Sequence, residues 1–456
     1  MLRRALVLSL LILSGSALFG AESRLVSDQQ GAPIRWSGWS DAVLARAKKE
    51  QKPLFVFVAA FGSHDTRQML REAFLNGEVA EMMNAYFVPV ILDARTRPDL
   101  ARMYGAIAAT TDLPLNLILT PEGKPFVSFG YTGTAELSRQ LVIQANRWKD
   151  ERAAVLAEAE QKVKTVAPAT THEIPLRASA LLAQLRGGDR DAAVDALHKL
   201  AASALYDQLG GGFHRAANDA ERREPMYEKT LADQALLATA YLEAWQITHD
   251  DAFLRVARAT LDFVLRDLRA PNSGPFDAGE EADSLVPGEG PVFATGAFYT
   301  WDAAELERLL GDEAADKVIR LYGIERGARH ALALHQPQLL GEATPSLQKM
   351  LEIRQKRPSP FRDDQALAGD NALMISALAR AAAVLRDETY LRGALSAATY
   401  LTTKLWNAQT KTLARAPGVV ALPEDYTFAV QAMLDLFDAT YDVRWLDLAL
   451  AMQTRL

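Results

Sequence analysis

The sequence contains no cysteine among its 456 residues. Structural disulfides, thiol–disulfide exchange and thiolate metal sites all require cysteine sulfur, so none of them is available to this chain. The sequence also has only seven histidines, and none shows the spacing of a metal motif such as H-E-x-x-H. We therefore expect no metal site and no cofactor.

Basic residues are also fewer than acidic residues. The 50 Lys and Arg residues are outnumbered by 57 Asp and Glu residues, which gives a formal net charge of −7. No basic run with interleaved aromatic residues occurs, so neither nucleic acid nor an anionic membrane surface is an expected partner. With 49% hydrophobic residues, the composition is that of a globular protein, and the length predicts two or three domains of roughly 150 residues each.

The N-terminus resembles a targeting segment. Residues 1–21 contain a positive LRR run, a short apolar run at 5–13 and the small residues GSA at 15–17, the pattern of a signal peptide. The apolar run is shorter than the about 20 residues that span a bilayer, and no later segment has a transmembrane pattern. We therefore expect a periplasmic or secreted protein with no membrane contact beyond its signal peptide; a retained N-terminal anchor is the alternative.

Residues 34–150 alternate between strand and helix patterns, in the order β-α-β-α-β-β-α. The alternation predicts an α/β layer that ends in an antiparallel pair. A loose leader at 22–33 precedes it, and a linker at 151–174, with the run TVAPATT, follows it. The predicted strands lie near 53–60, 86–93, 113–120 and 124–131, and the helices near 40–50, 64–74, 77–86, 98–104 and 134–148.

From residue 175 to the end the pattern is almost wholly helical. Amphipathic stretches come in pairs joined by short turns, such as THDD at 248–251, LRDE at 385–388 and TYDVR at 440–444. Repeated helix pairs build either an α-solenoid or a closed α/α toroid. Because no fixed repeat period is visible, the toroid is favoured.

Several segments in one order carry a family resemblance. They include WSGWSDAVLARAKKEQKPLFV, LPLNLILTPEGKPF, YDQLGGGFHR, YEKTLADQALLATAYLEA and EDYTFAVQAMLDLFDATYDVRWLDLAL. The chain thereby resembles the spermatogenesis-associated protein 20 family, also called YyaL-type. The resemblance implies a thioredoxin-like domain at 34–150 and an all-α toroid-like, six-hairpin glycosidase-like domain at 175–456. Family members continue beyond the position of Leu456, so this toroid is expected to be incomplete.

The first departure from the family falls in the redox loop. Where the family has a C-H-W-C-H-type motif, this chain reads SHDTR, with Ser63 and Thr66 in the places of both sulfurs. Their hydroxyls form no disulfide, and Ser63 is expected to be a helix N-cap. His64 and Asp65 are expected to be a solvated pair. The family's Trp-Pro is matched by Leu-Pro, which implies a cis Pro114 beside which an extended peptide or protein segment would pair.

The helical domain holds the candidate catalytic residues. The resemblance to sugar-active toroids implies acid–base chemistry at one mouth, by histidines or carboxylates. Met226 stands where the family has a histidine, which disfavours epimerase chemistry. Structural ion pairing is the competing interpretation for each candidate. The candidates in matched segments are His214, Glu228, Asp233, Asp283 and Asp425.

Two functional interpretations remain open. In the first, the protein lacks dithiol redox activity and binds a protein partner or a glycan. In the second, it is a glycosidase-like or epimerase-like enzyme that uses carboxylates at the toroid mouth, with aromatic residues such as Tyr299 and Trp301 stacking on sugar rings. The number of departures from the family favours the first. The second requires His214, Glu228, Asp283 and Asp425 to converge around one cavity.

Overall fold

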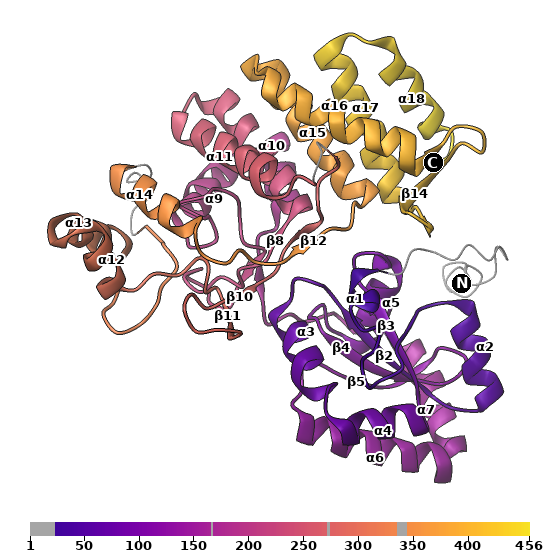
Figure 1. Cartoon of the computed structure of the whole chain (residues 1–456). Helices are drawn as coiled ribbons and strands as arrows, with labels where there is room; N and C mark the ends of the chain where they lie inside the picture. Colours follow the sequence, from indigo (N-terminus) through magenta and orange to yellow (C-terminus); the bar gives the residue numbers. More distant parts are fainter. Residues whose placement is uncertain (1–22, 166, 271–273, 335–343) are drawn as a thin grey trace.

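The computed structural model describes residues 23–165, 167–270, 274–334 and 344–456. These form an N-terminal α/β domain, at the bottom of Figure 1, and a helical domain above it. The predicted signal peptide, residues 1–21, lies outside the described residues. Export therefore stays a prediction.

A five-stranded mixed sheet forms the centre of the N-terminal domain. Its strand order is β1-β3-β2-β4-β5; β3 is parallel to β1 and β2, and β4 is antiparallel to β2 and β5. The four predicted strands are all present, and with the flanking helices they make up the predicted thioredoxin-like domain. The strands are β1 (Ser37–Gly38), β2 (Leu54–Ala59), β3 (Val88–Asp93), β4 (Leu115–Leu119) and β5 (Pro125–Phe129).

Helices cover both faces of this sheet. The central strand β2 is apolar at every position, and all six of its residues are buried. Phe55 and Phe57 belong to the core under α1, the π-helical turn at Met69–Ala73, α4, α6 and α7, whereas Leu54 and Val56 belong to the core under α2 and α5. This alternation follows from the two-residue period of a strand. The helices are α1 (Arg24–Ser27), α2 (Asp41–Glu50), α3 (His64–Gln68), α4 (Gly77–Tyr86), α5 (Pro98–Ala108), α6 (Thr134–Asp150) and α7 (Arg152–Lys164), with a π-helical turn at Met69–Ala73.

The N-terminal domain extends further at both ends than the sequence predicts. α7 lies inside the predicted linker at 151–174, yet its Val155 and Ala159 are fully buried in the core on the α4–α6 face of the sheet. Upstream, Leu25 and Val26 of the predicted loose leader belong to the same core. Both segments therefore belong to the folded domain, because each buries apolar side chains against the sheet.

The helical domain is built mainly from antiparallel helix pairs, which confirms the predicted α/α organisation. Gly311, with φ +81°, separates two of these helices, Ala303–Leu310 and Asp312–Tyr322. The pairs are α8 (Ala178–Arg186) with α9 (Arg190–Ala202), α10 (Leu231–Thr248) with α11 (Asp251–Asp267), α12 (Ala303–Leu310) with α13 (Asp312–Tyr322), α15 (Ala368–Leu385) with α16 (Glu388–Tyr400), and α17 (Pro423–Thr440) with α18 (Val443–Gln453); α14 (Thr344–Arg354) follows α13.

Short strands connect these helices and form small sheets between them. The order β12-β9-β8 brings three connecting segments together in one sheet, and β10 pairs with β11. A π-helical turn at Leu401–Leu405 follows α16. The strands are β6 (Ile174–Pro175), β7 (Ala216–Ala217), β8 (Lys229–Thr230), β9 (Gly279–Glu280), β10 (Asp283–Leu285), β11 (Phe293–Thr295), β12 (Arg362–Asp363), β13 (Trp406–Asn407), β14 (Thr412–Ala416) and β15 (Val419–Val420).

Three of the hairpin turns share one local design. α10 ends at His249 and α17 ends at Tyr441, each in the left-handed conformation that commonly terminates a helix. The next residue, Asp250 or Asp442, accepts a hydrogen bond from the first turn of the following helix. The turn between α15 and α16 repeats the design with Arg386 and Asp387. Each pair therefore reverses direction within two residues.

The four helices α8, α10, α15 and α17 lie side by side in that order, and α9, α11, α16 and α18 pack outside them. This inner-and-outer arrangement is that of an α/α toroid, drawn as an arc across the top of Figure 1. α15 is long and apolar enough to cross a membrane by length and composition, but 67% of it is buried inside the domain, as in a core helix. The N-terminal ends of α10, α15 and α17 lie near Arg95 and Arg102 of the thioredoxin-like domain.

Candidate functional site at the domain junction

The redox-like loop of the N-terminal domain is buried against the helical domain. Ser63 Oγ accepts the Thr66 amide at 3.4 Å, which confirms the predicted N-cap. The Ser63 side chain is 3% exposed and that of Thr66 is fully buried. The Gly62 carbonyl accepts the Ala282 amide at 2.9 Å. A Cβ on Gly62 would lie 3.1 Å from the Glu280 carbonyl oxygen, so the two backbones are in close contact.

The sequence predicted that His64 and Asp65 form a solvated pair. In the structure, His64 instead bonds across the junction to the helical domain. Its Nδ1 lies 2.7 Å from Asp283 Oδ1 and 2.8 Å from Thr295 Oγ1. The hydrogen bond to Asp283 raises the pKa of His64. Arg71 Nη1 donates to the other oxygen of Asp283 at 3.2 Å. Asp283, a predicted catalytic residue, is thus held between two side chains of the N-terminal domain.

A second ion pair lies beside the first. Arg67 of α3 pairs with Glu281, whose side chain is fully buried, and Arg71 lies 3.9 Å from the same carboxylate. Burial raises the pKa of Glu281 to about 7, although the two arginines oppose the shift. Burial also lowers the pKa of Arg67. Removing charged groups from water disfavours their charged forms, which accounts for both directions.

Glu228, another predicted catalytic residue, is held by Arg215. The guanidinium group donates to both Glu228 oxygens at 3.1 Å and also binds Glu173. The Glu228 side chain is 1% exposed, and its Oε2 would lie 3.4 Å from a Cβ on Gly62. Glu228 therefore forms a structural ion pair next to the redox-like loop. Structural ion pairing was the competing interpretation that the sequence left open for this residue.

Three neighbouring inner helices each place an aspartate at the third residue of the helix. These residues are Asp233 of α10, Asp370 of α15 and Asp425 of α17. Carboxylates are stabilised at helix N-termini, yet burial raises the pKa of all three. Their negative charges also act on one another, Asp233 and Asp425 on Asp370. The sequence predicted Asp233 and Asp425 but missed Asp370.

The members of this aspartate row have different partners. Asp233 accepts the Thr230 hydroxyl at 2.5 Å. Asp425 accepts from Arg415 at 2.7 Å and from the amides of Leu422 and Gly369 at 2.8 and 3.1 Å. Among the described residues, Asp370 has no hydrogen bond or ion pair, and its side chain is partly exposed.

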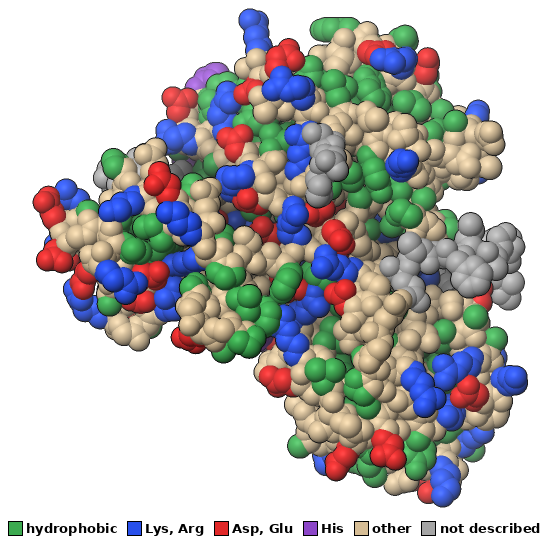
Figure 2. All heavy atoms as spheres, in the orientation of Figure 1, with side chains coloured by type: hydrophobic (Ala, Val, Ile, Leu, Met, Phe, Trp, Pro, Cys, Tyr) green, Lys and Arg blue, Asp and Glu red, His purple; other side chains and the backbone are tan. Residues whose placement is uncertain are grey.

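Arginines of both domains complete the junction. Arg95, which follows β3, donates to the Ala278 carbonyl at 2.7 Å and lies 3.6 Å from Asp363. Its own carbonyl accepts from Arg415 at 2.7 Å, so one residue connects the sheet to β12 and β14. Figure 2 shows side chains of both charge signs gathered where the two domains meet.

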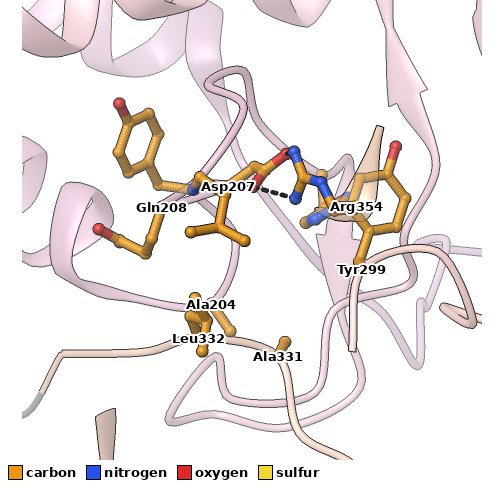
Figure 3. Close-up of a pocket in the computed structure, with 10 residues that line it drawn as sticks. Ala204, Asp207, Gln208, Tyr299, Ala331, Leu332 and Arg354 are labelled. Atoms are coloured by element: carbon orange, nitrogen blue, oxygen red, sulfur yellow. Dashed lines mark hydrogen bonds and ion pairs between the residues drawn. The ribbon is translucent and has the colours of Figure 1, made fainter. Parts of the chain in front are cut away.

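His214 lies in the interior of the helical domain, where its Nδ1 is 3.0 Å from the carbonyl oxygen of Tyr227, the residue before Glu228. It lines a cavity of about 10 Å³, large enough for roughly one water molecule. Figure 3 shows Asp207 and Arg354 pointing toward each other beside Tyr299 in this cavity, with 2.7 Å between Arg354 Nη1 and Asp207 Oδ1. Burial and the nearby charge of Lys229 lower the pKa of His214 to about 3. It is therefore neutral near neutral pH.

The predicted catalytic residues do not converge. Within the described part of the chain, no hydrogen bond or ion pair joins the side chains of any two of the five candidates. Charge interactions reach further: Glu228 acts on Asp233, and Glu228 and Asp283 both act on Asp65. The convergence of the five candidates around one cavity, which an enzyme at the toroid mouth requires, is not observed. The candidates are His214, Glu228, Asp233, Asp283 and Asp425.

The Leu113–Pro114 peptide is cis, as predicted. The segment just before it is paired with the chain itself: the Thr111 amide donates to the Thr170 carbonyl, and the Thr170 amide donates to the Ala109 carbonyl, at 3.1 and 3.0 Å. Asp112 accepts the hydroxyl of Thr171 at 2.6 Å. The connecting segment between the domains thus occupies the backbone groups beside this loop.

The fold and the junction define a two-domain protein in which a thioredoxin-like domain is docked on an α/α helical domain. Residues 16–167 match the family described as "Thioredox_DsbH: Protein of unknown function, DUF255". Over 92% of its length, the chain is similar to spermatogenesis-associated protein 20, with 27% identity to the Rattus norvegicus protein and 26% to the Homo sapiens protein. The resemblance predicted from the sequence is confirmed.

The chain spans 66% of the length of the rat relative and 67% of the human one. Among solved structures, it is similar to a GH76 alpha-mannanase from Bacteroides thetaiotaomicron, with 12% sequence identity and a TM-score of 0.36. That match covers 60% of this chain and 54% of the mannanase.

Proposed function

We propose that this chain is an exported protein without dithiol redox activity that acts by binding another protein. The observation that carries the proposal is the position of the redox-like loop. A thioredoxin-like domain that exchanges disulfides presents this loop to its client, because the mixed disulfide forms there. In this chain Ser63 and Thr66 are buried, and the loop is bonded to the helical domain through His64 and Arg67. The loop serves to hold two domains together.

A protein partner is supported over a glycan by where the aromatic residues lie. Tyr299 is 4% exposed, and Tyr241 and Trp301 are fully buried. Side chains in these positions pack the core and do not offer a ring face to a sugar. The cavity at His214, at about 10 Å³, is also far smaller than the several hundred Å³ typical of a ligand pocket.

The absence of cysteine allows a sharp test of the loop. In a Ser63→Cys/Thr66→Cys variant, every thiol signal comes from the introduced residues. We expect both thiols to react with DTNB about a hundredfold more slowly than the thiol of Val420→Cys, because a buried group reacts only after local opening. Val420 is a suitable control because its side chain is 77% exposed. In urea the two variants should react equally fast.

The same variant tests the redox part of the proposal. Insulin reduction should stay at the background rate even with a dithiol installed, because an insulin chain has no access to the buried loop. A double variant that reduces insulin, or that reacts with DTNB as fast as Val420→Cys, would contradict the proposal. Export is tested separately, by fusing alkaline phosphatase after residue 40 and measuring phosphatase activity in intact cells.

A carbohydrate-directed activity is the second candidate, and the aspartate row favours it. Asp370 is a partly exposed carboxylate that has no bonding partner among the described residues, and burial raises its pKa. Such a group suits general acid–base catalysis. An Asp370→Asn variant should then lose the release of reducing sugar from an oligosaccharide panel, whereas Asp438→Asn, at an exposed position of α17, should retain it. No release by the unaltered protein would exclude this candidate.

A further inference from the structure

A groove with an apolar floor lies between α4 and α6, outside the junction. It encloses about 620 Å³. Both helices lie on the side of the thioredoxin-like domain that points away from the helical domain, at the bottom of Figure 1. The groove therefore stays accessible while the redox-like loop is held in the junction. Its apolar lining is formed by Met82, Tyr86, Val142 and Ile143.

The exposure of this lining is larger than packing within the domain requires. Tyr86 is 57% exposed, Val142 49% and Ile143 36%. Clustered apolar side chains on a protein surface commonly mark an interaction site. These three residues, from two adjacent helices, line the same groove, so burying them together would stabilise a complex through the hydrophobic effect.

The shape of the groove selects a helical occupant. A bound strand gains its affinity from backbone hydrogen bonds to a free sheet edge. The walls of this groove are α-helices, whose backbone groups already bond within the helix. An amphipathic helix needs only an apolar floor. α4 has ten residues and is thus about 15 Å long, which matches a partner with apolar residues at positions i, i+3 or i+4, and i+7.

The charge of the groove selects a basic occupant. Glu78 and Glu81 line one wall, and neither has an ion pair among the described residues. The single cation of the lining, Arg139, is already bound by Glu136 through two hydrogen bonds of 2.8 and 2.6 Å. The groove therefore carries two uncompensated negative charges beside its apolar floor, and positive residues flanking the apolar face of a partner would complement them.

We infer that the α4–α6 groove is the docking site for an amphipathic, basic α-helix of a partner protein. This inference rests on the proposed binding function and names the surface and the chemical class of its partner. The apolar floor supplies affinity, and Glu78 and Glu81 select a positively charged helix.

The inference is tested with the full-length protein and a fluorescein-labelled 14-residue peptide, LKKLLKLLKKLLKL, by fluorescence anisotropy. A Val142→Ser/Ile143→Ser variant should weaken binding about tenfold, because it removes exposed apolar area without creating a cavity. Glu78→Gln/Glu81→Gln should weaken binding about threefold and flatten its dependence on salt. As a matched control, Ile247→Ser/Val292→Ser, at positions 45% and 46% exposed outside the groove, should bind like the unaltered protein.

Three outcomes would overturn the inference. If a peptide with glutamate in place of every lysine binds as tightly as the basic peptide, the groove does not select a positively charged partner. Equal binding by the Val142→Ser/Ile143→Ser variant would place the peptide elsewhere. A dimer that is lost in that variant, seen by light scattering, would assign the groove to a second copy of the chain. These outcomes are independent of the DTNB test on the Ser63→Cys/Thr66→Cys variant. If its thiols react slowly but no peptide binds at the groove, only the inference about the groove is overturned. If its thiols react fast, the proposed binding function itself is overturned.

Discussion

His64 of α3 and Asp283 of β10 are 219 residues apart in sequence and 2.7 Å apart in the structure. Their hydrogen bond joins the redox-like loop of one domain to a strand of the other. The loop position at which a thioredoxin-like domain carries out exchange is therefore used here for domain contact. The stability of the junction should consequently depend on the ionisation of this pair.

We expect the His64 contact to stabilise the protein more at low pH than at high pH. The pKa of His64 is raised above its usual 6.5 by Asp283, so its stabilising effect is complete below about pH 6.5 and is lost as pH rises through the raised pKa. His64→Gln should lower the free energy of unfolding by up to about 1 kcal/mol at about pH 5.5, allowing for its partial exposure, and by less at about pH 9. Urea unfolding at both values measures this. An equal loss at both values would contradict it. The control is His249→Asn, at an exposed position whose side chain has no ion pair among the described residues.

Glu281 should give the junction a second pH dependence. Burial raises its pKa from 4.5 to about 7, so the folded state favours the protonated carboxyl, and stability falls as pH rises from about 4.5 to 7. Glu281→Gln cannot ionise and should flatten this part of the stability curve, with a difference on the order of 2 kcal/mol across the range. Thermal melting from about pH 4.5 to 8 checks it. Glu289→Gln, at an exposed position, should keep the slope, and a slope retained by Glu281→Gln would refute the assignment.

Gly62 should be intolerant of a side chain. Its Cβ would lie 3.1 Å from the Glu280 carbonyl oxygen and 3.4 Å from Glu228 Oε2, so a methyl group requires the Glu280 backbone to move by a few tenths of an ångström. Gly62→Ala should destabilise the protein by about 1–2 kcal/mol and increase cleavage between the domains in limited proteolysis. Gly77→Ala, which has no atom within 4 Å of its added Cβ, should be neutral or slightly stabilising because it lies in the first turn of a helix. Similar cleavage of both variants would argue against a tight junction.

Local patterns predicted much of the fold. The continuous apolar run at Leu54–Ala59 predicted a buried strand, and Ser63 was recognisable as the cap of the helix that follows. The paired residues at the hairpin turns, such as His249 and Asp250, also followed from local chemistry. α7 was missed because it buries little more than Val155 and Ala159, which is too weak an apolar stripe to distinguish from a linker.

The partners at the junction could not be predicted in the same way. Arg67 and Glu281, or Arg95 and Asp363, are each separated by more than 200 residues, and no local periodicity relates them. Which arginine meets which carboxylate is fixed only by how the two domains dock. Asp370 shares with Asp233 and Asp425 the third position of an inner helix, but this common position becomes visible only once the structure fixes where each helix begins.

The aspartate row yields the last prediction, which contrasts two of its members. Burial raises the pKa of Asp370, and no bond to it is found among the described residues. Asp370→Asn should therefore remove a desolvated charge and stabilise the protein by on the order of 1 kcal/mol near neutral pH. Asp425 also has a raised pKa, but it accepts bonds from Arg415 and two backbone amides. Because an asparagine would turn an N–H group toward one of these donors, Asp425→Asn should destabilise by about 2 kcal/mol.

Urea unfolding of both variants and of Asp438→Asn, at an exposed position, measures the contrast. A residue whose removal increases stability is one that folding alone does not require, and such residues commonly serve function. Destabilisation of Asp370→Asn to the extent of Asp425→Asn would instead show that Asp370 supports the structure. If Asp370→Asn is stabilised and still binds the basic peptide at the distant α4–α6 groove, the two features are independent. Any activity of the aspartate row then belongs to a site separate from the partner site.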